Sequence, residues 1–181
     1  IFGGQGYNSC FALNGILVCG TNAGWGVPQC NFVADYGYHQ WNAGVVVLNS
    51  GGIEKRNTYK AGGSVIGKTI VNSAVNDVAM TVLPDAPIDP ATGLPIPTIA
   101  VATDGGVSVI KDDGTVVDWL TSHGAMSDIY IDGELLVASG GLGLAFYSWG
   151  RYSLPLSDTD DFDFISSTTF LANKILRQGS Q

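Results

Sequence analysis

One short phrase of alternating apolar residues occurs three times in this chain, each time ending in a small residue and a hydroxyl. The copies are "ILVCGT" (Ile16–Thr21), "TIAVAT" (Thr98–Thr103) and "ELLVAS" (Glu134–Ser139). Strict alternation is typical of a strand with one buried face. We expect the small residue and the hydroxyl to mark the end of each strand against a close neighbour. The repeat therefore predicts an all-β protein.

Further strands are predicted on either side of each phrase. A leading strand repeats as "CFALNG", "DVAMTV" and "DIYIDG", and a following strand as "GVVVL", "GVSVI" and "GLAFY", with hairpin turns at "NSGG" and "KDDG". The unit is then a meander of antiparallel strands, closed by a fourth. A four-stranded repeat of about 40 residues is typical of a β-propeller blade. The alternative is a β-sandwich with similar hairpins.

Three such units do not close a ring, because propellers usually have at least about four blades. The rest of the ring is expected in sequence beyond this chain, in a degenerate blade at residues 57–73, or on another chain that covers the edges. The chain starts at Ile1 without an initiator Met, so we expect a processed or excised piece. Repeats are predicted over residues 1–156, with insertions at 25–42 and 83–97, followed by an acidic linker and C-terminal segment at 157–181.

The composition excludes several classes of protein. Of the 181 residues, 45% are hydrophobic and 13% charged, and 25 are glycine, which fits neither a disordered chain nor a helical bundle. The net charge of −8 repels phosphate backbones, so no nucleic-acid partner is expected. No apolar run approaches the roughly 20 residues of a membrane span, so none is predicted.

The first insertion, "WGVPQCNFVADYGYHQWN", is rich in aromatic residues. Sugar C–H faces stack on exposed rings, and polar side chains beside the rings bind hydroxyls, so a glycan-binding loop is the functional hypothesis for this stretch. Packing of the rings onto the loop's own blade is favoured over it, because a loop this apolar must bury some of its side chains. We expect this stretch to hold the most exposed aromatic surface of the chain. The candidate ligand-binding residues are Trp25, Asp35, Tyr36, Tyr38, His39 and Trp41.

The second insertion, Leu83–Pro97, contains five prolines and is expected to be stiff and outside any strand ladder. An edge cover and an interface arm are both open roles for it. No chemistry is visible in its residues.

The cysteines favour a hairpin cross-link over a metal site. A two-residue turn at Asn14-Gly15 places Cys10 opposite Cys19 at a non-hydrogen-bonded position, which allows a cross-strand disulfide. The alternative is two small thiols packed in the sheet. No pair of cysteines has C-x-x-C spacing, so neither a metal nor a cofactor is expected.

Catalytic signals are weak. Ser122 and His123 are adjacent, but no spacing identifies a triad. A pair of aspartates for glycoside hydrolysis stays open, because separation in space does not show in the sequence. The acidic stretch "DTDDFD" lacks the glycine and distal glutamate of a calcium loop and is predicted to be a solvated linker. No catalytic residue is assigned, and the chain is expected not to be an enzyme.

The stretch "VNDVAMTVLPDAPIDPATGLPIPTIAVATDGGVSVIKDDGTVVD", Val75–Asp118, resembles propeller repeats of large structural proteins of marine tailed phages. Its phrase "VATDGGVSVI" is also similar to two-component-regulator propeller blades. The resemblance implies a virion tail or fibre component that touches a host surface, and it transfers no catalytic residue. The aromatic insertion departs from the usual blade.

We therefore expect a non-enzymatic structural or binding module of a virion tail or fibre, located in the virion or outside the cell. Its expected partners are other copies or other chains of the same assembly, with a host-surface glycan as candidate ligand. Two alternatives stay open: a secreted glycosidase or lyase on a propeller scaffold, and a purely architectural assembly protein.

Overall fold

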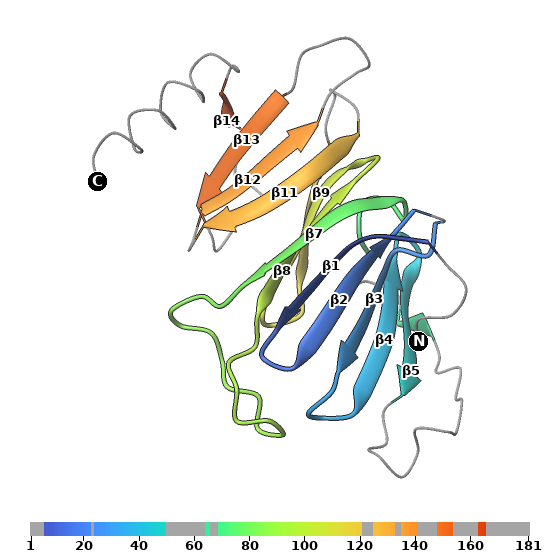
Figure 1. Ribbon diagram of the computed structural model, residues 1–181, viewed down its shortest axis with the longest axis vertical. Coiled ribbons are helices and arrows are strands. Elements are labelled where there is room, and N and C mark those ends of the chain that lie inside the picture. The colour runs from blue at the N-terminus through green and yellow to red at the C-terminus, as the bar shows by residue number, and fades with distance from the viewer. Residues whose placement is uncertain are drawn as a thin grey trace.

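The computed structural model describes residues 6–22, 24–49, 64–65, 69–120, 125–132, 135–140, 148–153 and 163–165. These residues form three antiparallel sheets (Figure 1) and contain no helix, hence none that is long and apolar enough to span a membrane. The all-β class predicted from the repeat is confirmed. The strands of the first sheet are β1 (Tyr7–Leu13), β2 (Ile16–Thr21), β3 (Val27–Asn31), β4 (Tyr36–Trp41), β5 (Gly44–Asn49) and β6 (Ser64–Val65).

The second and third sheets each have four strands in simple chain order, so every strand pairs with its neighbours along the sequence. The second sheet comprises β7 (Val75–Thr81), β8 (Thr98–Thr103), β9 (Gly106–Ile110) and β10 (Val116–Leu120). The third comprises β11 (Met126–Asp132), β12 (Leu135–Gly140), β13 (Ser148–Ser153) and β14 (Asp163–Ile165). The four-stranded antiparallel meander is therefore confirmed as predicted for the second unit. The third unit is also a four-stranded meander, but its third strand is β13 and not "GLAFY", which lies outside the described residues, and β14 falls within the segment that was expected to be a linker.

The aromatic stretch at residues 25–42 is not the loop that the sequence predicts. It forms the hairpin β3–β4, so "GVVVL" is the fifth strand of the first sheet and not the third. Its turn is closed by the Asn31 Oδ1, which accepts hydrogen bonds from the amides of Val33 and Ala34, while Asp35 takes a positive φ of 52°. The alternation of polar and apolar residues that indicates a strand is not visible in this stretch, because aromatic residues occupy both faces of β4.

The first strand of each sheet contains one extra residue at the same place. The pairing of β1 with β2, of β7 with β8 and of β11 with β12 shifts at Asn8, Asn76 and Ser127 respectively. These matching bulges place Gly140 of β12 where Thr21 and Thr103 stand in β2 and β8. The predicted alignment of "ELLVAS" is therefore one residue out of register, and the true third copy is "LLVASG".

The strand-ending hydroxyls behave as expected in the first two copies. The Thr21 Oγ1 donates to the Gly26 carbonyl at 3.0 Å, and the Thr103 Oγ1 donates to the Gly106 carbonyl at 2.9 Å. Both threonines are buried, and each hydroxyl finds its acceptor in a nearby main-chain carbonyl, so neither is left without a hydrogen-bond partner.

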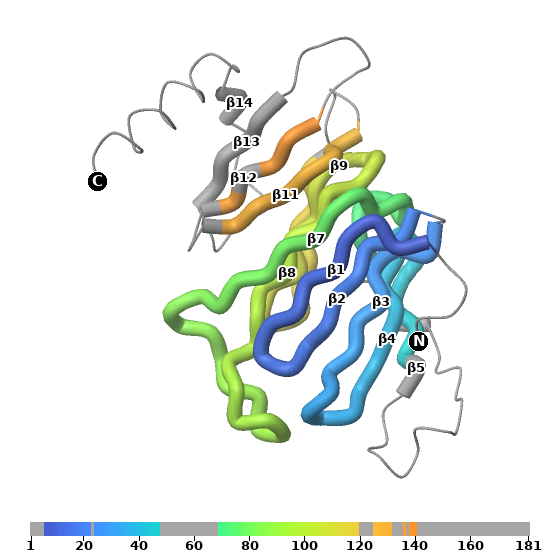
Figure 2. The backbone as a smooth tube through the Cα atoms, in the orientation of Figure 1, coloured from blue at the N-terminus to red at the C-terminus, as the bar shows by residue number. Residues whose placement is uncertain are grey.

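The second sheet is covered on both faces, which explains why all of β8 and β9 is buried. Alternation sends Ile99 and Val101 into a core shared with the first sheet, whereas Ala100 and Ala102 enter a core shared with the third. The first strands β1, β7 and β11 contact one another in series, and β7 runs between the other two (Figure 2). The sheets therefore stack one after another.

The same bulge also links neighbouring sheets. The Asn8 Nδ2 donates to the Val75 carbonyl of the second sheet at 2.9 Å, and the Asn76 Nδ2 donates to the Met126 carbonyl of the third at 2.8 Å. Each acceptor is the first residue of the next leading strand. The asparagine at the bulge therefore makes the same hydrogen bond to the next sheet at both junctions.

The candidate fourth unit at residues 57–73 supplies no separate sheet among the residues that the structure describes. Ser64–Val65 form β6, which pairs with β5 of the first sheet, and 57–63 and 66–68 lie outside the described residues. Farther on, the Ser73 carbonyl accepts from the Gly26 amide at 3.0 Å, so this connection is tied to the first sheet.

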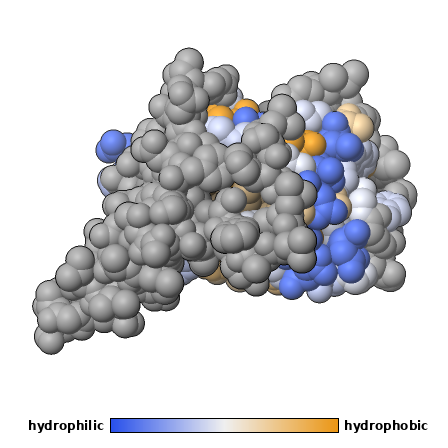
Figure 3. Space-filling view, turned by 90° about the horizontal axis from the view of Figure 1, so that it is seen from above, coloured by the Kyte–Doolittle hydropathy of each residue, from blue (hydrophilic) through white to orange (hydrophobic). Residues whose placement is uncertain are grey.

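Seen from above, the described surface shows a broad hydrophilic band with only small hydrophobic patches (Figure 3).

Candidate functional site

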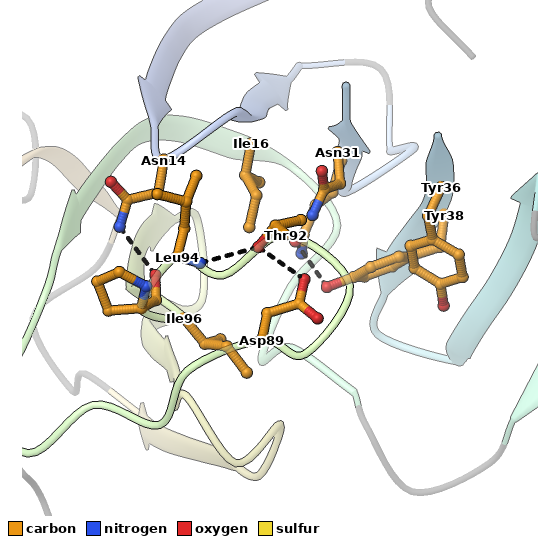
Figure 4. Close-up of a pocket in the computed structure, with 11 residues that line it drawn as sticks. Asn14, Ile16, Asn31, Tyr36, Tyr38, Asp89, Thr92, Leu94 and Ile96 are labelled. Carbon is orange, nitrogen blue, oxygen red and sulfur yellow. Dashed lines mark hydrogen bonds between the residues drawn. The ribbon is translucent and has the colours of Figure 1, made fainter. Parts of the chain in front are cut away.

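A cavity of about 180 Å³ lies between the first sheet and the proline-rich segment Leu83–Pro97 (Figure 4). The first sheet contributes the end of its first hairpin and one face of β3 and β4. The proline-rich segment closes the opposite side. The lining residues are Asn14, Ile16, Gln29, Asn31, Tyr36, Tyr38, Asp89, Thr92, Leu94, Pro95 and Ile96.

The proline-rich segment folds back on itself where it lines the cavity. Ile88 and Pro95 form an antiparallel bridge, and the Asp89 carbonyl accepts from the Gly93 amide at 2.8 Å, where φ is +70°. The Asn14 Nδ2 then donates to the Pro95 carbonyl at 2.8 Å and ties the segment to the β1–β2 turn. The segment is therefore a cover for the first sheet.

Gln29 is the most unusual residue of the cavity. Its side chain is 3% exposed, and its Oε1 accepts a hydrogen bond from the Tyr38 hydroxyl at 2.6 Å. Its Nε2 is buried and has no hydrogen-bond partner among the described residues. A buried donor without an acceptor costs about 1–3 kcal/mol, so the Gln29 amide is an energetically unfavourable feature of the cavity wall.

Two tyrosines form the aromatic wall beside Gln29. The rings of Tyr36 and Tyr38 are 5.4 Å apart between centroids and tilted by 57°. Burial raises the pKa of Tyr36, and burial followed by the nearby Tyr36 phenol raises the pKa of Tyr38 well above its usual range. Both phenols therefore stay protonated at neutral pH and remain neutral hydrogen-bonding groups.

Asp89 supplies the single carboxylate among the described residues that line the cavity. Its Oδ1 accepts from the Ala91 amide at 2.9 Å and its Oδ2 from the Thr92 hydroxyl at 3.2 Å, so the carboxylate is held by its own turn. The rest of the lining is made of amides, phenols, a hydroxyl and aliphatic groups. This environment suits a small neutral ligand with hydroxyl or carbonyl oxygens, and it disfavours an anion.

The residues predicted from the aromatic stretch do not form one site. Strand alternation places Tyr36 and Tyr38 on the cavity face of β4 and puts His39 and Trp41 on the opposite face. Trp25 lies beside His39, with the rings edge to face at 6.2 Å. Asp35 sits in the turn between β3 and β4. The structure therefore brings two of the six predicted residues to the cavity.

The expected exposed aromatic surface is present in this stretch, with Trp25 49% and Phe32 58% exposed. The most exposed aromatic side chain among the described residues is nevertheless Tyr130 of β11, at 64%. Trp25 therefore remains accessible, so a second aromatic surface exists on the face of the first sheet away from the cavity.

The sequence missed most of the cavity. Asn14 was recognised only as a turn residue, and the proline-rich segment carrying Asp89 and Thr92 showed no chemistry. The available signal was the "DPATG" stretch, whose Asp, Thr and Gly are typical of a tight turn that presents a carboxylate and a hydroxyl. That this turn meets Gln29 follows from tertiary contacts between residues far apart in the chain.

The predicted cross-strand disulfide is present in the structure. Cys10 and Cys19 are directly opposite in the β1–β2 register, disulfide-bonded, with Cα atoms 4.1 Å apart. The turn between them has positive φ at Asn14 (50°) and Gly15 (77°), as expected for a two-residue hairpin. No group of three metal-ligating side chains occurs in the part of the chain that the structure describes.

Comparisons with known proteins find no match: no family model, no curated protein and no solved structure is similar to this chain. The resemblance to phage propeller repeats, which covers Val75 to about Trp149 and the N-terminal third through the repeat, therefore depends on the sequence alone.

Proposed function

We propose that this chain is part of a β-propeller-type scaffold in which the three sheets are successive blades. Each sheet is a meander, and its first strand lies next to the first strand of the neighbouring sheet. The bulge and the asparagine contact recur at both junctions, and the middle sheet is buried on both faces. A two-sheet sandwich would bury only one face of each sheet.

We further propose that the scaffold is a non-enzymatic binding module and that its cavity takes one neutral saccharide ring. The single observation that carries this proposal is a cavity lined by a pair of tyrosine rings and by the Gln29 side chain, whose Nε2 has no acceptor among the described residues. A cavity of about 180 Å³ is smaller than the roughly 300–1,000 Å³ of typical ligand pockets. One ring or a terminal sugar therefore fits better than an oligosaccharide.

The lining favours binding over glycoside hydrolysis. Hydrolysis of a glycosidic bond generally uses two carboxyl groups that flank the bond. Among the described residues of the cavity, Asp89 alone carries a carboxylate, and its own turn already holds both oxygens. The enzyme alternative therefore finds no second carboxylate here.

We propose an extracellular setting, with a virion tail or fibre as the particular assembly. The Cys10–Cys19 disulfide supports a location outside the reducing cytosol. The tail or fibre assignment is supported by the resemblance of Val75–Asp118 to phage repeats, and the host-surface saccharide is the ligand that this setting would offer.

The test is a titration of the intact chain with a panel of neutral monosaccharides, followed by ligand-detected NMR. The double variant Gln29→Leu/Tyr38→Phe removes both partners of one hydrogen bond and the unpartnered amide, so its fold should survive. We expect it to weaken binding by about tenfold or more, the upper end for one hydrogen bond. The single variant Tyr38→Phe is the matched control, because it keeps the Gln29 amide, and it should bind more tightly than the double variant.

A second control separates the cavity from the surface predicted by sequence. Trp25→Ala removes the exposed ring on the opposite face and should leave cavity binding unchanged. If Trp25→Ala abolishes binding while the double variant does not, the cavity assignment is wrong and the sugar binds at Trp25. If no sugar of the panel binds, the saccharide proposal fails and the purely architectural alternative is favoured.

A further inference from the structure

We propose that two copies of this chain associate head to tail, with the third sheet of one copy packed against the first sheet of the other. The inference rests on the scaffold part of the proposed function and is independent of saccharide binding. It follows from a contact that joins two sheets within one chain, between a carboxylate of one sheet and a main-chain amide of the next. The third sheet has the equivalent carboxylate and the first sheet the equivalent amide, at opposite ends of the stack.

The junction between the second and third sheets shows the contact in full. The Asp77 Oδ2 accepts a hydrogen bond from the Ile129 amide of β11 at 2.9 Å. Asp77 directly follows the bulge of its own strand, whereas Ile129 is two residues beyond the bulge of the next one. A carboxylate after one bulge therefore binds an amide beyond the next bulge.

The third sheet repeats the carboxylate half of this contact with no further described sheet to receive it. Asp128 occupies the position of Asp77 and is exposed. Its Oδ2 accepts from the hydroxyls of Ser127 at 2.8 Å and Ser139 at 3.1 Å, which hold the carboxylate in place. Beside it, Tyr130 points away from the core formed with the second sheet and is 64% exposed.

The first sheet carries the receiving half of the contact. By the same register, Cys10 of β1 corresponds to Ile129, so its amide is the equivalent partner for a carboxylate. Cys10 and Ala12 lie on the face of the first sheet that points away from the second, and both are small and exposed. Small side chains leave room for a large ring such as that of Tyr130.

A second copy of this chain is the partner that can bind both end sheets. The third sheet, at one end of the stack, carries Asp128 and Tyr130, and the first sheet, at the other end, carries the Cys10 amide and Ala12. An interface that joins two different surfaces of identical chains is a heterologous interface. Two copies bring six sheets, within the roughly four to eight blades of known propellers, so a pair of chains closes a ring without open ends.

The experiment measures the molar mass of the intact chain by light scattering during size-exclusion chromatography. The expected mass is twice the 18.9 kDa of one chain. Tyr130→Glu and Ala12→Arg each place a charge in one half of the interface, and each is expected to weaken dimerisation by about thirtyfold or more, the effect of a lost hot spot. Ile88→Glu is the matched control, because Ile88 is 58% exposed on the proline-rich segment, and it should stay dimeric.

Mixing the two disruptive variants tests the head-to-tail geometry. The Ala12→Arg chain keeps its third sheet and the Tyr130→Glu chain keeps its first, so an equimolar mixture should restore the dimer. A monomeric wild type, a dimeric Tyr130→Glu variant or a mixture that stays monomeric would each overturn the proposal. Circular dichroism verifies that the variants fold, and Tyr130→Ser replaces Tyr130→Glu if the latter does not.

Discussion

Asp77 provides the most informative test of how the sheets are joined, because its carboxylate binds two main-chain amides from different sheets. Its Oδ1 accepts from the Val78 amide and its Oδ2 from the Ile129 amide, both at 2.9 Å. Val78 is 3% and Ile129 5% exposed, so water does not readily replace the lost acceptor. Asp77→Ala therefore leaves two buried donors without partners.

The expected cost follows from these contacts. Hydrogen bonds to a charged group contribute about 1.5–3 kcal/mol each, so the loss of two in Asp77→Ala should lower the free energy of unfolding by about 3–6 kcal/mol. Asp113→Ala is the matched control, because Asp113 also accepts two hydrogen bonds, from the Thr115 amide and hydroxyl, but in an exposed turn. That variant removes the same charge and should cost about 1 kcal/mol or less.

The assay is equilibrium unfolding in urea, followed by tryptophan fluorescence. Hydrogen exchange at the Ile129 amide adds a local measurement, since this amide should lose protection in Asp77→Ala but not in Asp113→Ala. Equal unfolding free energies for the two variants, with unchanged exchange at Ile129, would refute the role of Asp77 between the sheets. If Asp77→Ala does not fold, Asp77→Asn retains one acceptor oxygen and should show about half the loss.

Three further changes test other parts of the structure. Gly26→Ala should destabilise the protein by more than about 2 kcal/mol in thermal unfolding, because φ is +68° and the new Cβ would lie 2.1 Å from a carbonyl oxygen of β4. Gly24→Ala is the control, because Gly24 has a similar φ of +75° but open space around it. This control should show only the backbone strain of about 1–2 kcal/mol. Removing the disulfide with Cys10→Ser/Cys19→Ser should lower stability by about 2–3 kcal/mol, the entropy of a loop of this length, and a reductant should have no further effect on that variant. Leu136→Ala should cost about 2–5 kcal/mol in urea unfolding, because this fully buried side chain fills the core between the second and third sheets; a loss below about 1 kcal/mol would contradict that packing.

The second sheet was the easiest part of the fold to predict. Its strands Thr98–Thr103 and Gly106–Ile110 are joined by a short glycine turn, and local alternation and turn chemistry agree there. The aromatic hairpin at residues 25–42 was missed because both of its faces carry large side chains, so polar and apolar residues do not alternate cleanly. The register of the third phrase was missed because Ser139 was taken for the strand-ending hydroxyl, whereas Gly140 occupies the position of Thr21 and Thr103.

The cavity was the hardest part to predict, because its two walls meet only in three dimensions. Asn14 and Pro95 are 81 positions apart in the chain, yet they share the hydrogen bond that brings the proline-rich segment over the first sheet. The predicted residues Tyr36 and Tyr38 reach the cavity through strand alternation alone. Gln29, whose unpartnered amide distinguishes the site, lies within the predicted aromatic stretch but among its less conspicuous residues.

The serial order of the sheets is tested most directly by an engineered cross-link between the first two. A Cβ built on Gly20 of β2 would lie 3.3 Å from the Cβ of Val75 on β7, close to the roughly 3.5–4.5 Å that joins two cysteines in a disulfide. The double variant Gly20→Cys/Val75→Cys should therefore form an intramolecular disulfide under mild oxidation, detected as one linked peptide by mass spectrometry. Recovery of both new cysteines as free thiols, or linked only between chains, would contradict the stacked arrangement.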